Sequence, residues 1–154
     1  MAFRLENRVP PPIVAALLAA LMYWTPALFP FASVEVPWRL EMAALLFALG
    51  AALDIAGLVH FMQAKTTVNP LDPGAASVLI TGGVYRFTRN PMYLGLATLL
   101  LAWAIWLENA VALAGVALFV WAMNRLQIAP EERALEARFG AEYSRYRSRV
   151  RRWI

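Results

Sequence analysis

Four apolar stretches, each long enough to form a membrane-spanning helix, constrain this 154-residue chain more than any other feature. A helix needs about 20 apolar residues to cross the hydrocarbon core of a bilayer, within a range of about 17–25. Hydrophobic residues make up 61% of the chain and charged residues only 16%, whereas roughly a quarter of a soluble domain is charged. We therefore expect an all-α integral membrane protein. Its predicted transmembrane helices are residues 13–29, 40–62, 91–107 and 110–128.

The distribution of Lys and Arg predicts the orientation of these four helices. An even number of spans leaves both termini on one side, and that side carries 13 of the 14 Lys and Arg residues, with Arg39 alone on the other. Cytosolic segments of membrane proteins carry an excess of these residues. We therefore expect both termini and the 63–90 connection in the cytosol, in an inner or plasma membrane. Only Glu108 and Asn109 separate the last two spans, which predicts a tight hairpin.

The C-terminal tail is basic and has the pattern of a helical arm. Pro130 suits a first helical turn, and Tyr143, Tyr146 and Trp153 recur on one face of an amphipathic helix. Because the arginines follow directly after an apolar helix, they favour anionic lipid headgroups rather than nucleic acid as a partner. We expect the arginines from Arg145 to Arg152 to form a lipid-facing or solvated surface on this cytosolic arm.

The cysteine and histidine content limits the kinds of site that the chain can form. The chain has no cysteine and a single histidine, His60, so we expect neither a disulfide framework nor a metal site. The length predicts one domain over residues 1–154. The oligomeric state is not readable, since lipid-facing and buried faces of apolar helices look alike in sequence.

Two polar clusters flank the predicted hairpin on its cytosolic side. The first is GGVYRFTRNPMYLG, residues 82–95, which leads into the third span. The second follows the fourth span and contains Arg125, Glu131, Glu132 and Tyr143. Because the hairpin is short, it brings guanidinium groups, carboxylates and tyrosines together at one site near the membrane surface.

These clusters resemble the membrane methyltransferases related to isoprenylcysteine carboxyl methyltransferase and the phospholipid N-methyltransferases. That family carries Gly-x-Tyr-x-x-x-Arg-His-Pro-x-Tyr-x-Gly, and this chain has GVYRFTRNPMYLG. A glutamate pair and a Phe-Gly-x-x-Tyr-x-x-Tyr pattern follow in the family, and here the sequence is EERALEARFGAEYSRY. The resemblance covers roughly residues 65–154, and the first two helices match only in hydropathy.

The resemblance implies S-adenosylmethionine as methyl donor, bound on the cytosolic side, and a lipophilic acceptor that enters from the bilayer. An arginine is the natural partner of the donor's carboxylate, carboxylates suit its ammonium and ribose hydroxyls, and aromatic rings suit its adenine. Arg89 and Glu132 are the candidate catalytic residues. The candidate cofactor-binding residues are Tyr85, Arg89, Asn90, Pro91, Tyr93, Gly95, Glu131, Glu132 and Tyr143.

Two positions leave alternatives open. Asn90 stands where the family usually has histidine, and asparagine keeps a hydrogen bond but cannot titrate near neutral pH. If that histidine is a base in relatives, this chain lacks it; if it orients the cofactor or backbone, Asn90 suffices. Asp54 lies inside the second span, where a carboxylate is costly. It lines an acceptor path or pairs with a cation there, or it hydrogen-bonds a neighbouring helix.

Two other functions compete with methyl transfer. Sterol and steroid reductases resemble the same family in their C-terminal helices, which makes an NADPH-dependent membrane reductase the first alternative. The second is a non-catalytic binding or assembly protein, in which Asn90 marks lost activity.

Overall fold

The computed structural model describes residues 9–63 and 78–154, in which all regular structure is helical apart from one isolated bridge between Ser33 and Asn109. The predicted all-α architecture is confirmed in these ranges. The α-helices are α1 (Pro11–Tyr23), α2 (Thr25–Leu28), α3 (Arg39–Gln63), α4 (Pro91–Leu107), α5 (Leu113–Met123), α6 (Ala129–Phe139) and α7 (Ala141–Arg149).

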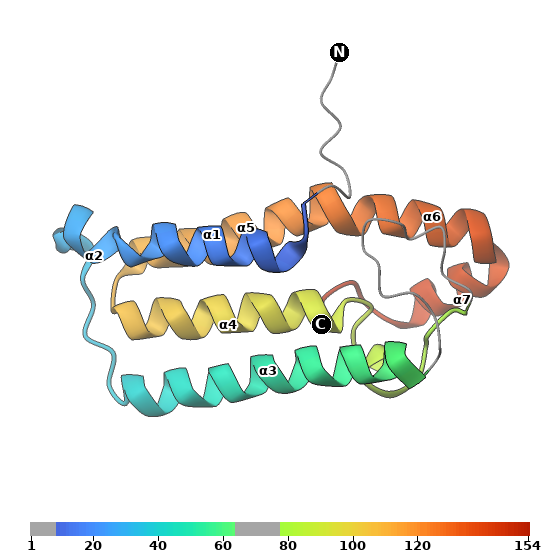
Figure 1. The fold of residues 1–154 in the computed structure, drawn as a ribbon, viewed down its shortest axis with the longest axis horizontal. Helices are drawn as coiled ribbons and strands as arrows, with labels where there is room; N and C mark the ends of the chain where they lie inside the picture. The colour runs from blue at the N-terminus through green and yellow to red at the C-terminus, as the bar shows by residue number, and fades with distance from the viewer. Residues whose placement is uncertain (1–8, 64–77) are drawn as a thin grey trace, which may run out of the picture.

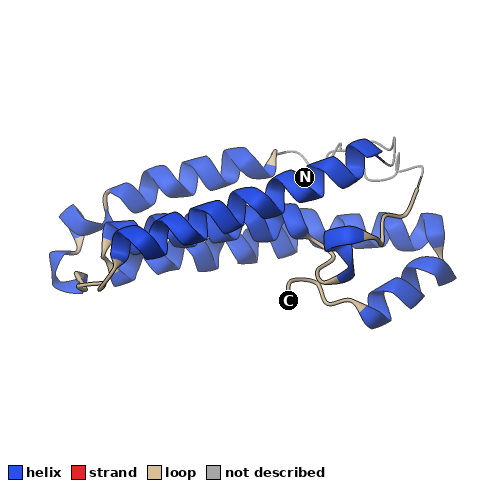
Figure 2. Ribbon diagram, turned by 90° about the horizontal axis from the view of Figure 1, so that it is seen from below, coloured by secondary structure: helices blue, strands red, loops and turns tan. Residues whose placement is uncertain are grey.

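The long helices form a bundle in which α4 contacts α1, α3 and α5 (Figure 1). Leu100 of α4 and Phe119 and Met123 of α5 are almost fully buried between these helices. Most side chains of α3 remain exposed outside the bundle, as expected for a helix that faces lipid. Helices α6 and α7 fold back on each other beyond one end of the bundle (Figures 1 and 2).

The helical segments agree with the four predicted spans. Three of them are long and apolar enough to cross a membrane, namely residues 11–28, 39–63 and 110–139. The remaining helix, α4, is apolar and runs over the predicted residues 91–107; its 17 residues are at the lower limit for a span. The protein is thus an integral membrane protein.

The last span differs from its prediction because it does not end before the tail. A π-helical turn, η5 (Asn124–Ile128), joins α5 to α6, so that one helical segment continues to Phe139. Pro130 lacks the N–H that an α-helix needs at an interior position. A π-turn next to a proline is a common way for a helix to continue through such a site. The positive φ of +48° at Gly140 then ends α6.

Glycine allows α3 and α4 to approach closely. A Cβ atom at Gly50 would lie 2.9 Å from the carbonyl oxygen of Gly95. A Cβ atom at Gly95 would lie 2.3 Å from Oδ1 of Asp54. Small residues at such contacts let helix backbones pack together in a bilayer. The position of α3 against α4 therefore depends on both glycines.

The predicted hairpin between α4 and α5 is confirmed. It is bound to the segment that connects α2 to α3. Glu108 ends α4 with a left-handed φ of +49°, and its carboxylate forms an ion pair with Arg39 and accepts a hydrogen bond from the Val36 amide. The Asn109 side chain donates to the Phe29 carbonyl at 2.9 Å. These contacts stabilise the end of the bundle opposite α6 and α7 (Figure 1).

Replacing Gly50 with valine is expected to separate α3 from α4 and to lower the free energy of unfolding by about 1–3 kcal/mol, the usual cost of overpacking. Thermal loss of the helical circular dichroism signal in detergent measures the change. Ala48→Val is the control, because Ala48 lies on the exposed side of the same helix. Equal melting temperatures for the two variants would contradict the packing argument.

Candidate functional site

A cavity of about 590 Å³ lies at the end of the bundle where α4 begins. It is lined by the start of α1, by the second half of α3, by α4 and by α6 and α7. Most of its wall is apolar, and the polar side chains that line it are Asp54, Tyr85, Arg89, Asn90, Tyr93, Glu131, Glu132, Tyr143 and Tyr146. The two sequence clusters thus meet around one cavity.

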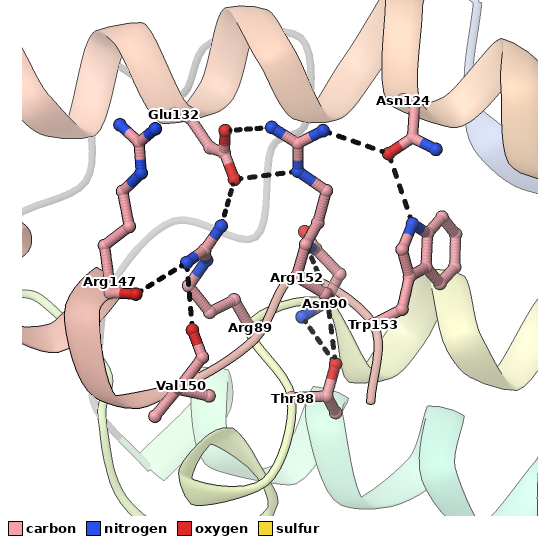
Figure 3. A network of polar contacts seen from close by, with 9 residues as sticks. All are labelled: Thr88, Arg89, Asn90, Asn124, Glu132, Arg147, Val150, Arg152 and Trp153. Carbon is pink, nitrogen blue, oxygen red and sulfur yellow. Dashed lines mark hydrogen bonds and ion pairs between the residues drawn. The ribbon is translucent and has the colours of Figure 1, made fainter.

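The centre of its polar wall is Glu132, which is held by two arginines. Arg89 Nη2 donates to Glu132 Oε1 at 2.6 Å, and the two side chains are only 9% and 11% exposed. Arg152 donates through Nε to Oε1 at 3.1 Å and through Nη2 to Oε2. Figure 3 shows both guanidinium groups directed at the one carboxylate. The hydrogen bond with Glu132 also raises the pKa of the Arg152 guanidinium, which stays charged.

Arg89 also binds the backbone at the end of α7 and in the C-terminal segment, residues 150–154. Its Nη1 donates to the carbonyl oxygens of Arg147 at 3.1 Å and of Val150 at 2.9 Å, and its backbone N–H donates to the carbonyl of Arg151 at 3.0 Å. The Arg147 carbonyl lies in the last turn of α7 and the Val150 carbonyl directly after it, where a helix leaves its carbonyls without donors, so the arginine satisfies them (Figure 3). One side chain therefore connects the loop before α4, helix α6 and the chain end.

Asn90 joins the same segment. Its Nδ2 donates to the carbonyl of Arg152 at 2.9 Å, and its backbone N–H donates to Thr88 Oγ1 at 3.1 Å. Thr88 is buried, and its hydroxyl donates to that Arg152 carbonyl at 3.3 Å. Asn90 thus acts in this structure as a hydrogen-bond tether for the C-terminal segment, in addition to lining the cavity.

The π-helical turn supplies the opposite anchor. Asn124, its first residue, accepts hydrogen bonds at Oδ1 from Trp153 Nε1 at 3.2 Å and from Arg152 Nη1 at 3.4 Å. The segment after α7 is therefore held from two sides, by the loop before α4 and by η5. A π-turn that presents a side chain to a polar network is typical of functional sites.

Glu131 and the tyrosines form the rest of the polar wall. Tyr93 of α4 donates its hydroxyl proton to Glu131 Oε1, and Tyr146 donates to the carbonyl of Tyr85 at 2.7 Å. Burial raises the pKa of Tyr143 to about 12 and also raises the pKa values of Tyr85 and Tyr146. These phenols are therefore neutral near pH 7 and act as hydrogen-bond donors or as aromatic surface.

Of the predicted cofactor-binding residues, all but Gly95 line the cavity. Gly95 lies instead where α4 packs against α3, because its missing side chain makes room for Asp54. Glu131 and Glu132, adjacent in sequence, have separate partners: the first binds Tyr93, and the second binds two arginines. Their roles as cofactor ligands remain predictions.

The expectation for the late arginines was wrong at Arg152. Four others, Arg145, Arg147, Arg149 and Arg151, are exposed as expected. Arg152 is partly buried in the ion pair with Glu132, because the chain turns back toward α4 after α7.

The sequence did not indicate two further residues of the polar network, Thr88 and Asn124. Thr88 lies inside the matched motif, but a threonine in a loop gives no sequence signal of its contacts with Asn90 and Arg152. The role of Asn124 depends on the π-helical turn.

Comparison with protein families agrees with the geometry. The sequence model of the family described as phospholipid methyltransferase matches residues 38–142, which include both polar clusters up to Glu142. The chain belongs to this family. The match begins at the second span, so it extends further toward the N-terminus than the motifs alone indicate.

Two of three similar proteins carry the name of a methyltransferase. Protein-S-isoprenylcysteine O-methyltransferase of Homo sapiens is 28% identical over 137 residues, which cover 89% of this chain and 48% of the human protein. The A form from Arabidopsis thaliana is 27% identical over 138 residues, covering 89% of this chain and 70% of that protein. An uncharacterized protein of Haemophilus influenzae is 52% identical over 63 residues, its whole length. The chain thus spans about half the length of its human relative.

Asn90→Ala is expected to loosen the C-terminal segment. The loss of one hydrogen bond, about 0.5–1.5 kcal/mol, corresponds to a roughly two- to tenfold larger population of the open segment. Digestion with a carboxypeptidase, followed by mass spectrometry, measures the release of Trp153. Arg86→Ala is the control, because Arg86 is exposed and makes no hydrogen bond or ion pair within the described residues. Unchanged release from the Asn90 variant would show that the tether is not needed.

Proposed function

We propose that this chain transfers a methyl group from S-adenosylmethionine to a lipophilic acceptor that reaches the site from the bilayer. One observation carries the proposal: a single cavity joins the polar wall around Arg89 and Glu131 to an apolar wall from the membrane-spanning helices. Membership of the phospholipid methyltransferase family supports the reaction type. The named activities of the relatives support it as well.

The residues of the cavity fit a methyl donor that carries a carboxylate, an ammonium group and an adenine. Arg89 Nε is buried and has no hydrogen-bond partner among the described residues, so one charged N–H remains available for a carboxylate. Glu131 uses one oxygen for Tyr93 and keeps the other for an ammonium or a hydroxyl. The rings of Tyr85 and Tyr143 supply aromatic surface for adenine.

The protein's contribution is positioning and the exclusion of water. The donor, when bound, supplies a methyl group already activated on sulfur. Arg89 would fix the carboxylate end, Asn90 and Pro91 would shape the loop beside it, and the C-terminal segment would close the cytosolic side. Holding the reacting groups in line within this cavity would account for a large rate increase without covalent catalysis.

Glu132 is proposed to act mainly through Arg89. Both of its carboxylate oxygens accept hydrogen bonds from arginine, so it orients the guanidinium that meets the donor. Arg89 is therefore proposed to contact the cofactor, and Glu132 to hold it in place. Both residues therefore belong to the proposed site. We expect donor binding to be more sensitive to the loss of Arg89 than to the replacement of Glu132 by glutamine.

Isothermal titration of purified protein with S-adenosylmethionine tests the proposal. Wild type is expected to bind, and Arg89→Ala is expected to bind about tenfold to a hundredfold more weakly, the effect of losing a hydrogen bond to a charged group. Glu132→Gln should weaken binding less, because glutamine keeps an acceptor for Arg89. Arg86→Ala, from the same motif, should bind as wild type does.

Two outcomes would overturn the proposal. The first is no binding of S-adenosylmethionine by wild type together with thermal protection by NADPH, which would favour a reductase. The second is equal affinity in wild type and Arg89→Ala. Circular dichroism of each variant distinguishes a lost contact from a lost fold.

We also propose that residues 1–154 act as one domain with its site in the cytosol, supported by the uneven distribution of Lys and Arg. Because the chain has no cysteine, single cysteines report the orientation. A membrane-impermeant maleimide is expected to label Glu35→Cys in intact cells and Ser148→Cys only after permeabilisation. Both positions are exposed. The reverse labelling pattern would place the site on the outer face.

A further inference from the structure

The π-helical turn η5 contains two polar side chains that bind different parts of the chain. Asn124 accepts hydrogen bonds from the C-terminal segment, as described above. Gln127, three residues later, is only 1% exposed. Its Nε2 donates to the carbonyl oxygen of Val9 at 2.8 Å, and Val9 lies directly before the N-cap of α1. One turn therefore holds both the start of α1 and the end of the chain.

The start of α1 is a wall of the cavity. Pro10, Pro11 and Pro12 line it, together with Ile128, the residue next to Gln127. Proline has a fixed φ and no backbone N–H. These three residues thus form a stiff wall that cannot be held by hydrogen bonds from its own amides. Its position depends on what binds the neighbouring carbonyls, and the Val9 carbonyl is bound by Gln127.

Gln127 contributes to the position of this wall more than to the stability of the fold. The contact with the Val9 carbonyl assigns the nitrogen of the amide, because a reversed amide would bring two oxygens together. The other atom, Oε1, is buried and has no hydrogen-bond partner among the described residues. A buried acceptor without a partner is costly, and this cost offsets the gain from one hydrogen bond. The net effect of Gln127 on the free energy of unfolding is therefore small.

We propose that Gln127 is a positioning residue that sets the width of the apolar part of the cavity and so selects lipophilic acceptors by their shape. The inference rests on the proposed function and adds a specificity-determining residue to it. Among the described residues Gln127 does not itself line the cavity, so it acts through the proline wall. The contacts of Arg89 and Glu131 do not involve Gln127. The acceptor and donor parts of the site are therefore controlled by different residues.

Hydrogen exchange tests the position of the wall without any ligand. Gln127→Met keeps the length of the side chain and removes its N–H. The first turns of α1 are then expected to exchange their amide hydrogens about two- to tenfold faster, the effect of losing one hydrogen bond on local opening. Mass spectrometry of the peptide that contains residues 11–18, from protein in nonionic detergent, measures the rate. The melting temperature should stay close to that of wild type.

Asn124→Ala, in the same turn, is the matched control. It is expected to release Trp153 faster to a carboxypeptidase, because Trp153 loses its acceptor, and to leave the exchange of α1 unchanged. Gln127→Met should show the reverse pattern. Equal exchange of α1 in wild type and Gln127→Met overturns the inference, and so does the same acceleration in both variants.

Two isomeric alcohols test the selection by shape. Dodecanol and its branched isomer butyloctanol have the same composition and differ in width. Native mass spectrometry measures the ratio in which the protein retains them from an equal mixture. The ratio of branched to straight isomer is expected to rise about two- to tenfold in Gln127→Met, since the wall is displaced more often. Asn124→Ala should keep the wild-type ratio. An unchanged ratio in Gln127→Met overturns the inference.

Binding of S-adenosylmethionine separates this inference from the proposed function. Gln127→Met is expected to bind the donor as wild type does. If wild type binds no donor, the proposed function fails, whereas exchange and isomer selection still decide whether Gln127 holds the wall. If Gln127→Met does not fold, Gln127→Asn replaces it, because its amide is one methylene too short to reach Val9. Failure of both variants to fold would show that Gln127 is needed by the whole fold, which overturns the inference.

Discussion

The ion pair between Arg89 and Glu132 is the interaction on which the end of this protein that holds the cavity depends. Both side chains are about nine-tenths buried, and removing one partner of such a pair leaves an uncompensated charge that costs about 3–5 kcal/mol. The pair joins the loop before α4 to α6, and Arg152 adds the C-terminal segment to it. Three parts of the chain that are distant in sequence thus share one carboxylate.

The pair also explains how a short chain forms a polar site next to its apolar helices. Backbone carbonyls of Arg147 and Val150 lie beyond the hydrogen bonding of α7 and would otherwise need water. The Arg89 guanidinium satisfies them and, in the same geometry, keeps one N–H without a partner among the described residues. The side chain that closes the site is therefore the side chain that is available to a ligand.

The sequence predicted the helices well and the site only in part. Hydropathy was sufficient for α4, whose bounds follow from Pro91 and from Glu108, and two matched motifs were sufficient to bring Arg89 and Glu132 together. Arg152 was misassigned, because in sequence it is one arginine of a basic run, and only the turn after α7 directs it inward. The π-turn at Asn124 depends on helix packing and has no sequence pattern of its own.

The substitution of the family's usual histidine by Asn90 has a physical interpretation. In this structure the position donates a side-chain N–H to the carbonyl of Arg152, a bond that an imidazole N–H can equally make. Asparagine and histidine can thus both make this tether, whereas only histidine can accept a proton near neutral pH. For an acceptor that must lose a proton, a base would have to come from another lining residue. Glu131 is bound to Tyr93, and Glu132 is bound to two arginines. Asp54 is the lining carboxylate that has no hydrogen-bond or ion-pair partner among the described residues.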